Sequence, residues 1–419
     1  MMRQALIRVR LATIMVLSGS MGVWAAEIAE WNQWQGPNRD AISMDTGLLR
    51  QWPEGGPKLV WKATGLGGGF AGVSFWADRI FTVGDKEDGS YLLALSRTDG
   101  KPLWSVKVGR AGGNDPQRPG PRCTPATDGT LVVALGQYGE LVCVEAATGK
   151  DLWRKSYQED FGGTAVPKWN FSESPLLDGE RLICLPGGPK GYMVALKKQT
   201  GELLWQAKDL TGNTNYTSAI VAEIGGVRQY IALTDAQVAG VAAADGKVLW
   251  TAPRTGKVSV IPTPICRDGI VFVTSGYGVG CSALRITAAN GAFKAEPIYA
   301  DAKIANHHGG AILVGDYVYT SVDPGLLTCL EFKTGKVVWQ DKGVGKGSLG
   351  YADGNLILRS ENGPVALVEA TSEGYKEKGR FDQPDRSKVN SWPHPVATGG
   401  RLYLRDQDVL LCYDLKAGS

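Results

Sequence analysis

The segment Val144-Glu-Ala-Ala-Thr-Gly-Lys-Asp-Leu-Trp153 is one of five closely similar segments in this 419-residue chain. Each segment has an apolar run, then a Thr-Gly or Asp-Gly pair, and then a tryptophan. The five segments span residues 95–104, 144–153, 196–205, 242–250 and 330–339. Two degenerate copies place Phe293 and Tyr375 where the tryptophan otherwise stands. The aromatic positions are therefore 104, 153, 205, 250, 293, 339 and 375, a spacing of 36–52 residues that is typical of repeat architectures.

Each repeat predicts four β-strands. The Thr-Gly or Asp-Gly pair predicts a hairpin turn, because glycine accepts the positive φ that such turns require. A second turn signal lies upstream in most copies, for example Asp178-Gly179 and Asp268-Gly269. Glycine supplies 56 residues, about 13% of the chain against a usual share of about 7%, as many tight turns require. Two hairpins per repeat make a four-stranded antiparallel blade, and a ring of such blades is a β-propeller.

The two ends of the chain complete the blade count. Residues 410–418 form the first half of a repeat and stop before its tryptophan, whereas Trp61 lies in a tryptophan strand without a preceding turn. Pairing these two segments would close the ring and hide its sheet edges. We therefore predict an all-β, eight-bladed propeller over residues 57–419. Seven blades is the alternative, if the short repeat at Tyr375 is an elaborated loop. We expect the repeat tryptophans in the core: Trp61, Trp104, Trp153, Trp205, Trp250 and Trp339.

The N-terminus predicts export. Arg3, Arg8 and Arg10 precede an apolar run over residues 11–23, and the small residues Val23 and Ala25 suit a signal-peptide cleavage site. We expect a signal peptide at 1–25, with an uncleaved membrane anchor as the alternative, and an extended strap at 26–56. No cysteine follows the apolar run, so no lipid anchor is expected. Removing three of the 45 Lys and Arg residues leaves 42 against 42 Asp and Glu, a neutral balance that argues against nucleic-acid binding.

The seven cysteines are expected to be free and buried. An odd number cannot pair completely within one chain, and none are adjacent in sequence. Cys143, Cys329 and Cys412 occupy similar apolar runs, where alanine stands in other copies. A cysteine that alternates with alanine is most simply a small buried apolar residue.

The repeat resembles that of pyrroloquinoline quinone (PQQ) propellers, the quinoprotein alcohol dehydrogenase-like family, which includes the propeller subunit of the outer-membrane assembly machinery. The N-terminal run from Trp31 to Asp40, together with residues 120–125 and 306–310, is similar to a subgroup of exported PQQ-like propellers. The resemblance covers residues 57–419 and implies the fold. It leaves the function open, since one fold hosts many functions.

The family's dehydrogenases hold PQQ over a tryptophan and beneath a disulfide of adjacent cysteines. They use Ca²⁺ to polarise the quinone and an aspartate as base. This chain has no adjacent cysteine pair and no Cys-x-x-Cys-His haem motif, and its length leaves no room for long insertions. We therefore expect no cofactor and a noncatalytic scaffold or binding module in the periplasm or outside the cell. A PQQ- and calcium-dependent alcohol or sugar dehydrogenase is the alternative.

Polar residues that precede the blades mark a candidate site. Such residues face a common axis in a propeller, so we expect them to ring one mouth of the central channel and to bind a protein, peptide or small-molecule ligand. Arg122 would pair with an anionic group of the ligand. Glu173 and the histidines would bind its hydrogen-bond donors or a cation, and Trp392 would offer a flat apolar face. The alternatives are that these groups only satisfy backbone groups and channel waters, or form a His/Glu metal site. We expect a monomer. The candidate site residues are Arg122, Asn170, Glu173, His307, His308, Trp392 and His394.

Overall fold

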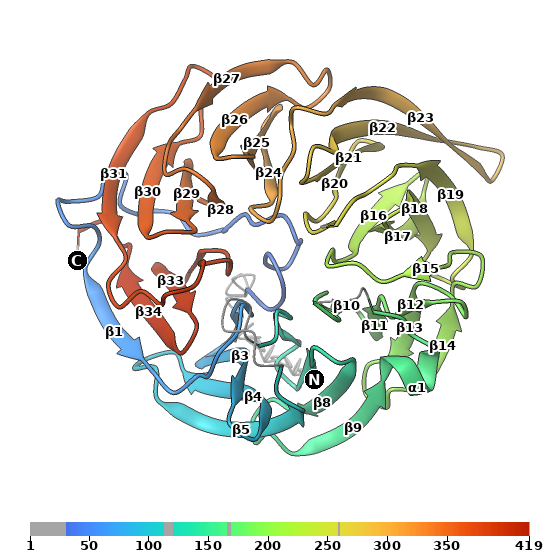
Figure 1. Cartoon of the computed structure of the whole chain (residues 1–419), viewed down its shortest axis with the longest axis horizontal. Coiled ribbons are helices and arrows are strands. Elements are labelled where there is room, and N and C mark those ends of the chain that lie inside the picture. The colour runs from blue at the N-terminus through green and yellow to red at the C-terminus, as the bar shows by residue number, and fades with distance from the viewer. Residues whose placement is uncertain (1–30, 113–119, 166–168, 259, 419) are drawn as a thin grey trace, which may run out of the picture.

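The computed structural model describes residues 31–112, 120–165, 169–258 and 260–418. The expected signal peptide and the first residues of the expected strap therefore lie outside the described residues. The chain forms eight four-stranded antiparallel sheets arranged as blades around a central axis (Figure 1). The predicted all-β, eight-bladed propeller is confirmed. No helix of the described chain is long and apolar enough to cross a membrane.

The first four blades follow one another along the chain. Blade 1 consists of β2 (Ser74–Trp76), β3 (Arg79–Lys86), β4 (Gly89–Ser96) and β5 (Pro102–Gly109). Blade 2 consists of β6 (Ala126–Thr127), β7 (Leu131–Leu135), β8 (Glu140–Glu145) and β9 (Asp151–Ser156). Blade 3 consists of β10 (Leu176–Asp178), β11 (Arg181–Cys184), β13 (Val194–Lys197) and β14 (Leu203–Gln206). Blade 4 consists of β16 (Ile220–Ile224), β17 (Val227–Leu233), β18 (Gln237–Ala242) and β19 (Val248–Pro253).

The remaining blades complete the ring. Blade 5 consists of β20 (Ile265–Arg267), β21 (Ile270–Ser275), β22 (Gly280–Ala289) and β23 (Ala292–Asp301). Blade 6 consists of β24 (Ala311–Val314), β25 (Tyr317–Val322), β26 (Leu326–Glu331) and β27 (Val337–Asp341). Blade 7 consists of β28 (Gly347–Ala352), β29 (Asn355–Ser360), β30 (Pro364–Glu369) and β31 (Glu377–Asp382). Blade 8 consists of β32 (Val396–Thr398), β33 (Arg401–Asp406), β34 (Val409–Asp414) and β1 (Leu59–Ala63). A short helix, α1 (Tyr157–Phe161), and a ribbon of β12 (Gly187–Gly188) and β15 (Gly212–Asn213) lie between blades or strands.

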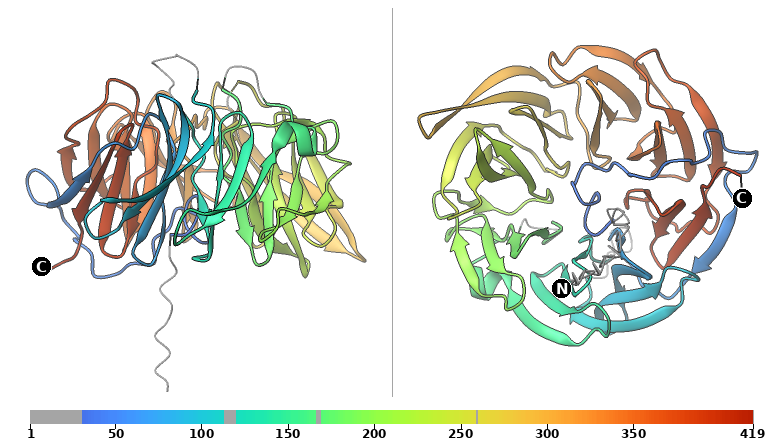
Figure 2. Two further views of the ribbon diagram at one scale, coloured as in Figure 1. Left: turned by 90° about the horizontal axis from the view of Figure 1, so that it is seen from below. Right: turned by 180° about the vertical axis from the view of Figure 1, so that it is seen from behind.

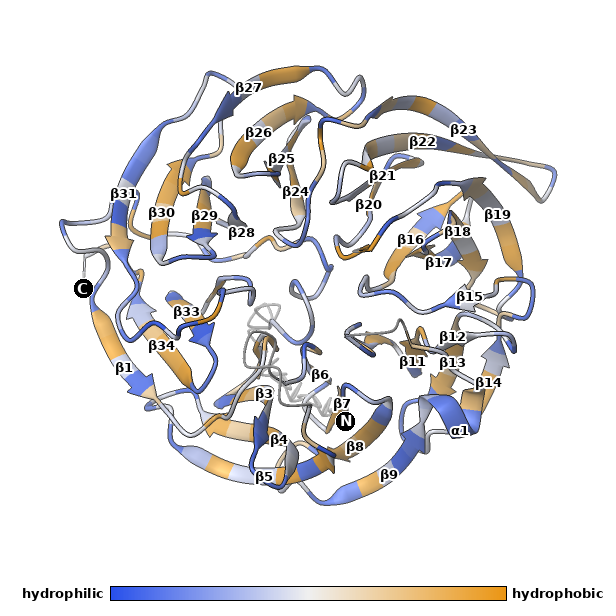
Figure 3. Ribbon diagram, viewed as in Figure 1, coloured by the Kyte–Doolittle hydropathy of each residue, from blue (hydrophilic) through white to orange (hydrophobic). Residues whose placement is uncertain are grey.

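The N- and C-terminal segments close the ring as predicted. Strand β1 pairs antiparallel with β34, and Trp61 lies opposite Cys412. The outer strand of blade 8 therefore comes from the beginning of the chain and its other three strands from the end (Figure 1). The hydrophobic residues concentrate in middle strands such as β26 and β30, whereas the outer β31 is mostly hydrophilic (Figure 3). The core accordingly lies between neighbouring blades.

The Thr-Gly and tryptophan positions of the repeat meet across blade boundaries. The indole of Trp205 in blade 3 lies against Gly246 in the turn of blade 4, and its Nε1 donates to the carbonyl of Ala243 at 3.2 Å. Trp104 makes the same contacts with Gly149 and the carbonyl of Ala146. A side chain on these glycines would collide with the ring, so the repeat joins blade 1 to blade 2 and blade 3 to blade 4.

Blades 5 and 7 differ from the sequence-based assignment of the aromatic position. In blade 5, Tyr299 stands in register with the tryptophans of the other blades. Strands β22 and β23 are longer than their counterparts, so Phe293 lies near the tip of this hairpin instead. In blade 7 the register position is Gly379, and Tyr375 precedes β31. Trp52 of the N-terminal segment covers Gly379, and its backbone nitrogen donates to the carbonyl of Lys378 at 2.8 Å. Trp52 does not reproduce the contacts of a repeat tryptophan, because its Nε1 has no hydrogen-bond partner among the described residues and no atom lies within 4 Å of the Cβ position of Gly418.

Burial of the repeat tryptophans is less complete than expected. Trp205 and Trp250 are buried, but Trp61, Trp104 and Trp153 are only partly buried, as is Trp339. These side chains stand on outer strands, where one face of the indole packs on the next blade and an edge reaches solvent. The cysteines follow the prediction: all seven are free, and six are buried while Cys266 is partly exposed.

Replacing Gly246 with alanine is expected to lower the free energy of unfolding by about 2–4 kcal/mol. The substitution adds the cost of a non-glycine residue at φ +77° to overpacking, since the new Cβ would lie 2.5 Å from the ring of Trp205. Gly226→Ala is the matched control, because Gly226 has φ +73° and no atom within 4 Å of its Cβ position. Urea unfolding of both variants measures the difference. Equal losses would show that the indole contact does not constrain this turn.

Candidate ligand-binding site

The first described residues fill one end of the central channel. Residues 31–43, here called the N-terminal plug, run into the middle of the ring (Figure 1). The blue segment that contains the plug crosses one face of the disc (Figure 2). The plug bonds to inner strands of several blades: the carbonyl of Trp31 accepts from the backbone nitrogen of Phe75 at 2.8 Å, and that of Asn32 from Thr127 at 2.9 Å. Ile42 pairs with Tyr351 of blade 7.

Arg39 anchors the plug. Its side chain is buried, and its guanidinium donates to the carbonyls of Ser174 at 2.6 Å, Pro175 at 2.7 Å and Ala219 at 2.6 Å. These carbonyls precede the inner strands of blades 3 and 4. Burial lowers the pKa of Arg39 to about 10, so the side chain stays charged at neutral pH.

Above the plug lies a cavity of about 490 Å³. Its walls come from the loops that precede the inner strands and from loops that join second to third strands, and both kinds of loop lie on the same face of a blade. The plug residue Asn32 bonds to Thr127 at the far end of inner strand β6, next to the turn that joins the first two strands of blade 2 on the opposite face. The cavity therefore opens on one face and has the plug, through Trp34, in its wall. It is lined by Trp34, Phe70, Arg122, Trp169, Ser172, Ser174, Tyr216, Ser218, Ile261, Tyr277, His307, His308, Lys346, Glu361, Asn390, Trp392 and His394.

Five of the seven candidate residues predicted from the sequence line this cavity: Arg122, His307, His308, Trp392 and His394. Asn170 and Glu173 do not line it. The backbone of Asn170 has φ 53°, a left-handed conformation in the loop before blade 3. The five candidates that line the cavity come from loops of blades that are far apart in sequence. The ring geometry brings these loops together.

Glu173 points into the protein interior. Its carboxylate accepts hydrogen bonds from the hydroxyl of Tyr157 and from the backbone nitrogen of Leu185, the latter at 2.7 Å. Burial raises its pKa to about 7. The side chain connects α1 to the loops of blade 3. This is a structural role, whereas the sequence predicted that Glu173 would contact a ligand.

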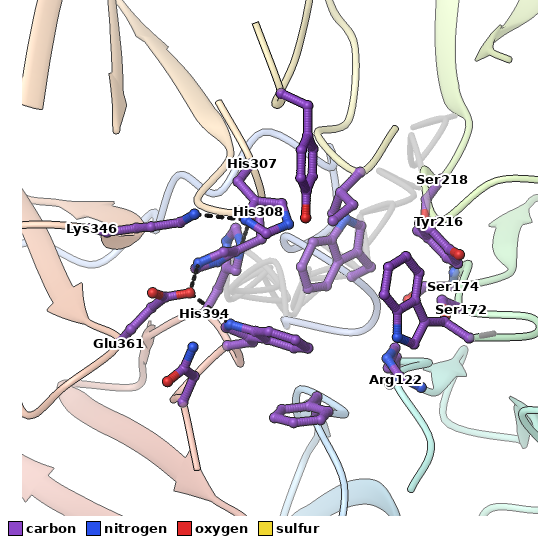
Figure 4. Close-up of a pocket in the computed structure, with 17 residues that line it drawn as sticks. Arg122, Ser172, Ser174, Tyr216, Ser218, His307, His308, Lys346, Glu361 and His394 are labelled. Carbon is purple, nitrogen blue, oxygen red and sulfur yellow. Dashed lines mark hydrogen bonds and ion pairs between the residues drawn. The ribbon is translucent and has the colours of Figure 1, made fainter. Parts of the chain in front are cut away.

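The histidine side of the cavity contains a hydrogen-bonded carboxylate. His308 Nε2 lies 2.7 Å from Glu361 Oε1, and Trp392 Nε1 donates to the same oxygen at 2.8 Å (Figure 4). Burial raises the pKa of Glu361, but the bonds and charge of His308 outweigh it and hold the pKa at about 2. Glu361 is therefore ionised and already engaged with two donors.

His307 is paired with a lysine on the same side. Lys346 Nζ lies 2.7 Å from His307 Nδ1 and 3.0 Å from Asp323 Oδ1. Burial lowers the pKa of His307 to about 4, helped by the charge of Lys346. Burial also lowers the pKa of His394 to about 4, and its Nε2 lies 3.0 Å from the carbonyl of His308. Both rings are neutral at ordinary pH.

The opposite side of the cavity carries Arg122 and several hydroxyl groups. Figure 4 shows Arg122, Ser172 and Tyr216 across the cavity from the histidines. The Arg122 guanidinium lies over the ring of Phe70 at 5.4 Å and donates to the carbonyl of Gly120 at 3.2 Å. The buried hydroxyls of Ser172 and Tyr216 have no hydrogen-bond partner among the described residues.

Aromatic rings connect the two polar sides. Trp392 packs against Phe70 with centroids 4.4 Å apart, and Trp169 meets Tyr216 at 5.7 Å. Trp34 lies edge-on to His394 at 4.8 Å, and its Nε1 donates to Thr263 at 2.9 Å.

Sequence reasoning did not single out several of these residues. Lys346 directly precedes β28, the inner strand of blade 7, whereas Glu361 follows the second strand of that blade and Tyr277 follows the second strand of blade 5. The aligned blade-start positions belong to blades 2, 3, 6 and 8, so they include neither blade 7 nor the loops between second and third strands. Counting the same loop in each repeat would have found Tyr277 and Glu361. Nothing in the repeat pattern marks Trp34.

The residues present do not match a PQQ and Ca²⁺ site of the dehydrogenase kind. Within the described ranges, no group of three or more His, Cys, Asp or Glu side chains is arranged to hold a metal ion. Among the described residues that line the cavity, Glu361 is the one carboxylate, and it already accepts bonds from His308 and Trp392. No cysteine lines the cavity either. We therefore derive no quinone chemistry for this site.

Sequence comparisons identify relatives. The profile of the family described as outer membrane protein assembly factor BamB matches residues 88–341, more than half of the chain. The chain is 25% identical over 197 residues to BamB of Xanthomonas campestris pv. campestris, covering 45% of this chain and 42% of that protein's own length. It is 23% identical over 306 residues to BamB of Moranella endobia, covering 68% of this chain and 74% of that protein.

Solved structures share the fold. BamB from Moraxella catarrhalis superposes with a TM-score of 0.60 at 13% identity, covering 86% of this chain and 98% of that one. Quinohemoprotein alcohol dehydrogenase from Comamonas testosteroni gives a TM-score of 0.67 at 11% identity, covering 94% of this chain and 82% of that one. At such identities these likenesses show the fold alone. The matching profile, with the repeat and the eight blades, shows that this chain belongs to the PQQ-like β-propeller family described as outer membrane protein assembly factor BamB.

Proposed function

We propose that the protein is an exported, noncatalytic propeller module that binds a ligand in the central cavity. The observation that carries the proposal is a cavity of about 490 Å³ with aromatic walls and two polar sides, which is the size and composition of ordinary ligand sites.

The relatives support a scaffold role. Proteins named outer membrane protein assembly factor are expected to work through contacts with other proteins, and a propeller offers loops of eight blades on the same face as the cavity mouth. A protein partner could therefore contact the loops while a peptide or small molecule occupies the cavity. Export into the cell envelope agrees with the basic and apolar N-terminus.

A thermal-shift screen of the purified protein against metals, PQQ, sugars and short peptides tests the binding proposal. A ligand of the cavity is expected to raise the melting temperature in the wild type and to lose that effect in the Arg122→Ala/His308→Ala double variant. Arg154→Ala is the control, because Arg154 lies on outer strand β9 and pairs with exposed Asp151 at 3.0 Å. A shift that persists in the double variant would place the ligand outside the cavity.

A redox-dye assay with PQQ, Ca²⁺ and a panel of alcohols and sugars tests the noncatalytic part of the proposal. The expected result is no dye reduction above a protein-free control, because the cavity's carboxylate is engaged by His308 and Trp392. Dye reduction that requires both PQQ and the protein would contradict the proposal and favour the dehydrogenase alternative.

A further inference from the structure

We infer that Glu173 is a proton-binding site, and that its ionisation weakens the attachment of the N-terminal plug to blade 3. The site lies outside the cavity, so the inference goes beyond the proposed function and does not depend on any ligand. It follows from the burial of the carboxyl group, from the charges around it and from the hydrogen bonds of the loop that carries it.

The carboxyl group of Glu173 is buried without a cationic partner. Glu173 is 1% exposed, and its carboxyl oxygen accepts hydrogen bonds from the hydroxyl of Tyr157 and the backbone nitrogen of Leu185. Both donors are neutral. An ionised carboxylate that is buried without a paired charge is costly, and such a group becomes protonated instead. The protonated carboxyl is therefore the form that this site favours.

The titratable groups that face Glu173 from the neighbouring elements include one charge, that of Arg39 in the plug. Its guanidinium donates to backbone carbonyls, and its buried Nε has no partner among the described residues. Burial raises the pKa of Glu173 to about 7 and outweighs the attraction of the Arg39 charge. Burial also raises the pKa of the four other groups, which are neutral at ordinary pH: Tyr157 on α1, Cys123 before β6, Cys184 on β11 and Tyr192 before β13.

The loop that carries Glu173 also holds the plug. The carbonyl of Ser174, the next residue, accepts from Arg39 at 2.6 Å. The hydroxyl of Ser174 accepts from the backbone nitrogen of Thr124 at 2.9 Å, and its backbone nitrogen donates to the hydroxyl of Ser218 at 2.9 Å. An ionised Glu173 gains solvation when this loop opens, and opening breaks the bond between Ser174 and Arg39. The plug should therefore be released more often when Glu173 is charged.

Proton uptake by Glu173 changes stability with pH in a defined direction. Its pKa is about 7 in the folded protein against 4.5 for an ordinary glutamate, so the folded protein binds more protons between these values than the unfolded chain. This contribution to stability is fully present below pH 4.5 and is lost as the pH rises through 7. Burial lowers the pKa of His307 and of His394 from 6.5 to about 4, so these two side chains act in the opposite direction. The test therefore compares two proteins that share both histidines.

Glu173→Gln removes the titration and keeps the shape of the side chain. The unfolding constant of the wild type, divided by that of the variant at the same pH, is expected to rise on the order of 50-fold between pH 5 and pH 8. Glu202→Gln is the matched control, because Glu202 is exposed and its side chain forms no hydrogen bond or ion pair among the described residues. Urea unfolding at each pH measures the ratios. A ratio that changes no more for Glu173→Gln than for Glu202→Gln would overturn the inference.

Carbon-13 labelling of the glutamate carboxyl groups in the wild type reads the protonation directly and does not require a variant to fold. One carboxyl signal is expected to titrate near pH 7 in nuclear magnetic resonance spectra, and Glu173→Gln assigns it by removing it. If every glutamate of the folded wild type titrates in the ordinary acidic range, Glu173 is not a proton-binding site and the inference fails.

Hydrogen exchange of the plug, residues 31–43, tests its coupling to Glu173. At pH 8 the plug amides are expected to exchange faster in the wild type than in Glu173→Gln, because the carboxylate is ionised only in the wild type. At pH 6 the two proteins should exchange at similar rates. Equal rates at pH 8 would overturn the coupling between the ionisation of Glu173 and the plug. A ligand found by the thermal-shift screen would leave these outcomes unchanged, so this inference and the proposed binding function fail separately.

Discussion

Replacing Arg39 with methionine is expected to lower the free energy of unfolding by about 3–5 kcal/mol, because hydrogen bonds to a charged group contribute about 1.5–3 kcal/mol each and three are lost. The guanidinium donates three hydrogen bonds of 2.6–2.7 Å to carbonyls of blades 3 and 4. Methionine fills a similar volume but donates no hydrogen bond, so these carbonyls would be left buried without their donor, at a cost of about 1–3 kcal/mol each where no water replaces it.

The plug also contains three non-glycine residues in the left-handed region: Gln35 at φ 59°, Arg39 at φ 57° and Ala41 at φ 60°. Such conformations cost about 1–3 kcal/mol each and persist only where the surroundings hold them. Loss of the Arg39 bonds should therefore release the plug and displace Trp34 from the cavity wall.

Urea unfolding monitored by circular dichroism measures this effect, and limited proteolysis reports release of the plug. Arg39→Lys should cause an intermediate loss of stability. The lysine ammonium keeps the positive charge but cannot bond to carbonyls of both blades as the planar guanidinium does. Arg285→Met is the exposed control, because Arg285 lies exposed on β22 and forms no side-chain hydrogen bond or ion pair among the described residues; its expected change is within about 0.5 kcal/mol. A loss for Arg39→Met no larger than that of Arg285→Met would show that the plug is not anchored by its arginine.

Trp205→Ala is expected to lower the free energy of unfolding by about 3–5 kcal/mol, the range for truncating a buried aromatic side chain. The indole of Trp205 is 8% exposed, packs on Gly246 and donates to the carbonyl of Ala243. Its removal leaves a cavity between blades 3 and 4 and an unsatisfied carbonyl.

Leu203→Ala is the matched control on the same strand. Leu203 lies two residues before Trp205 on β14 but is 45% exposed, so its truncation should cost about 0.5 kcal/mol or less. Equilibrium unfolding in denaturant compares the two variants. Similar losses would mean that the repeat tryptophan is not the main contact between blades 3 and 4.

The period of the repeat was enough to predict the fold. Hairpin turns at Thr-Gly and Asp-Gly pairs depend on local backbone preferences, and the tryptophan after each turn marks the outer strand. The pairing of Trp61 with residues 410–413 could be predicted because each end of the chain carries only part of a repeat, and joining the two parts makes one complete blade. The register in blades 5 and 7 could not be predicted, because Tyr299 takes the tryptophan's place in blade 5 and Gly379 stands there in blade 7.

The site was predicted in part for the same reason. Equivalent loops of a radial fold face one axis, so Arg122, His307, His308, Trp392 and His394 could be brought together from sequence positions alone. The orientation of an individual side chain has no such symmetry. Glu173 stands one residue after Ser172 in the same loop, yet its carboxylate turns inward to Tyr157 and Leu185 while Ser172 lines the cavity.

The sequence by itself determined the blade architecture, its closure and the ring of loops that holds the candidate site, because these depend on local turn chemistry and on a repeated apolar pattern. Only the tertiary structure decided which side chains form the cavity wall. The N-terminal plug carries no repeat signal, and it lies in the channel because Arg39 bonds there to three carbonyls of blades 3 and 4. Trp34 reaches the cavity through that long-range anchoring. Contacts between residues 135 to 180 positions apart are set by the geometry of the closed ring, which no local pattern encodes.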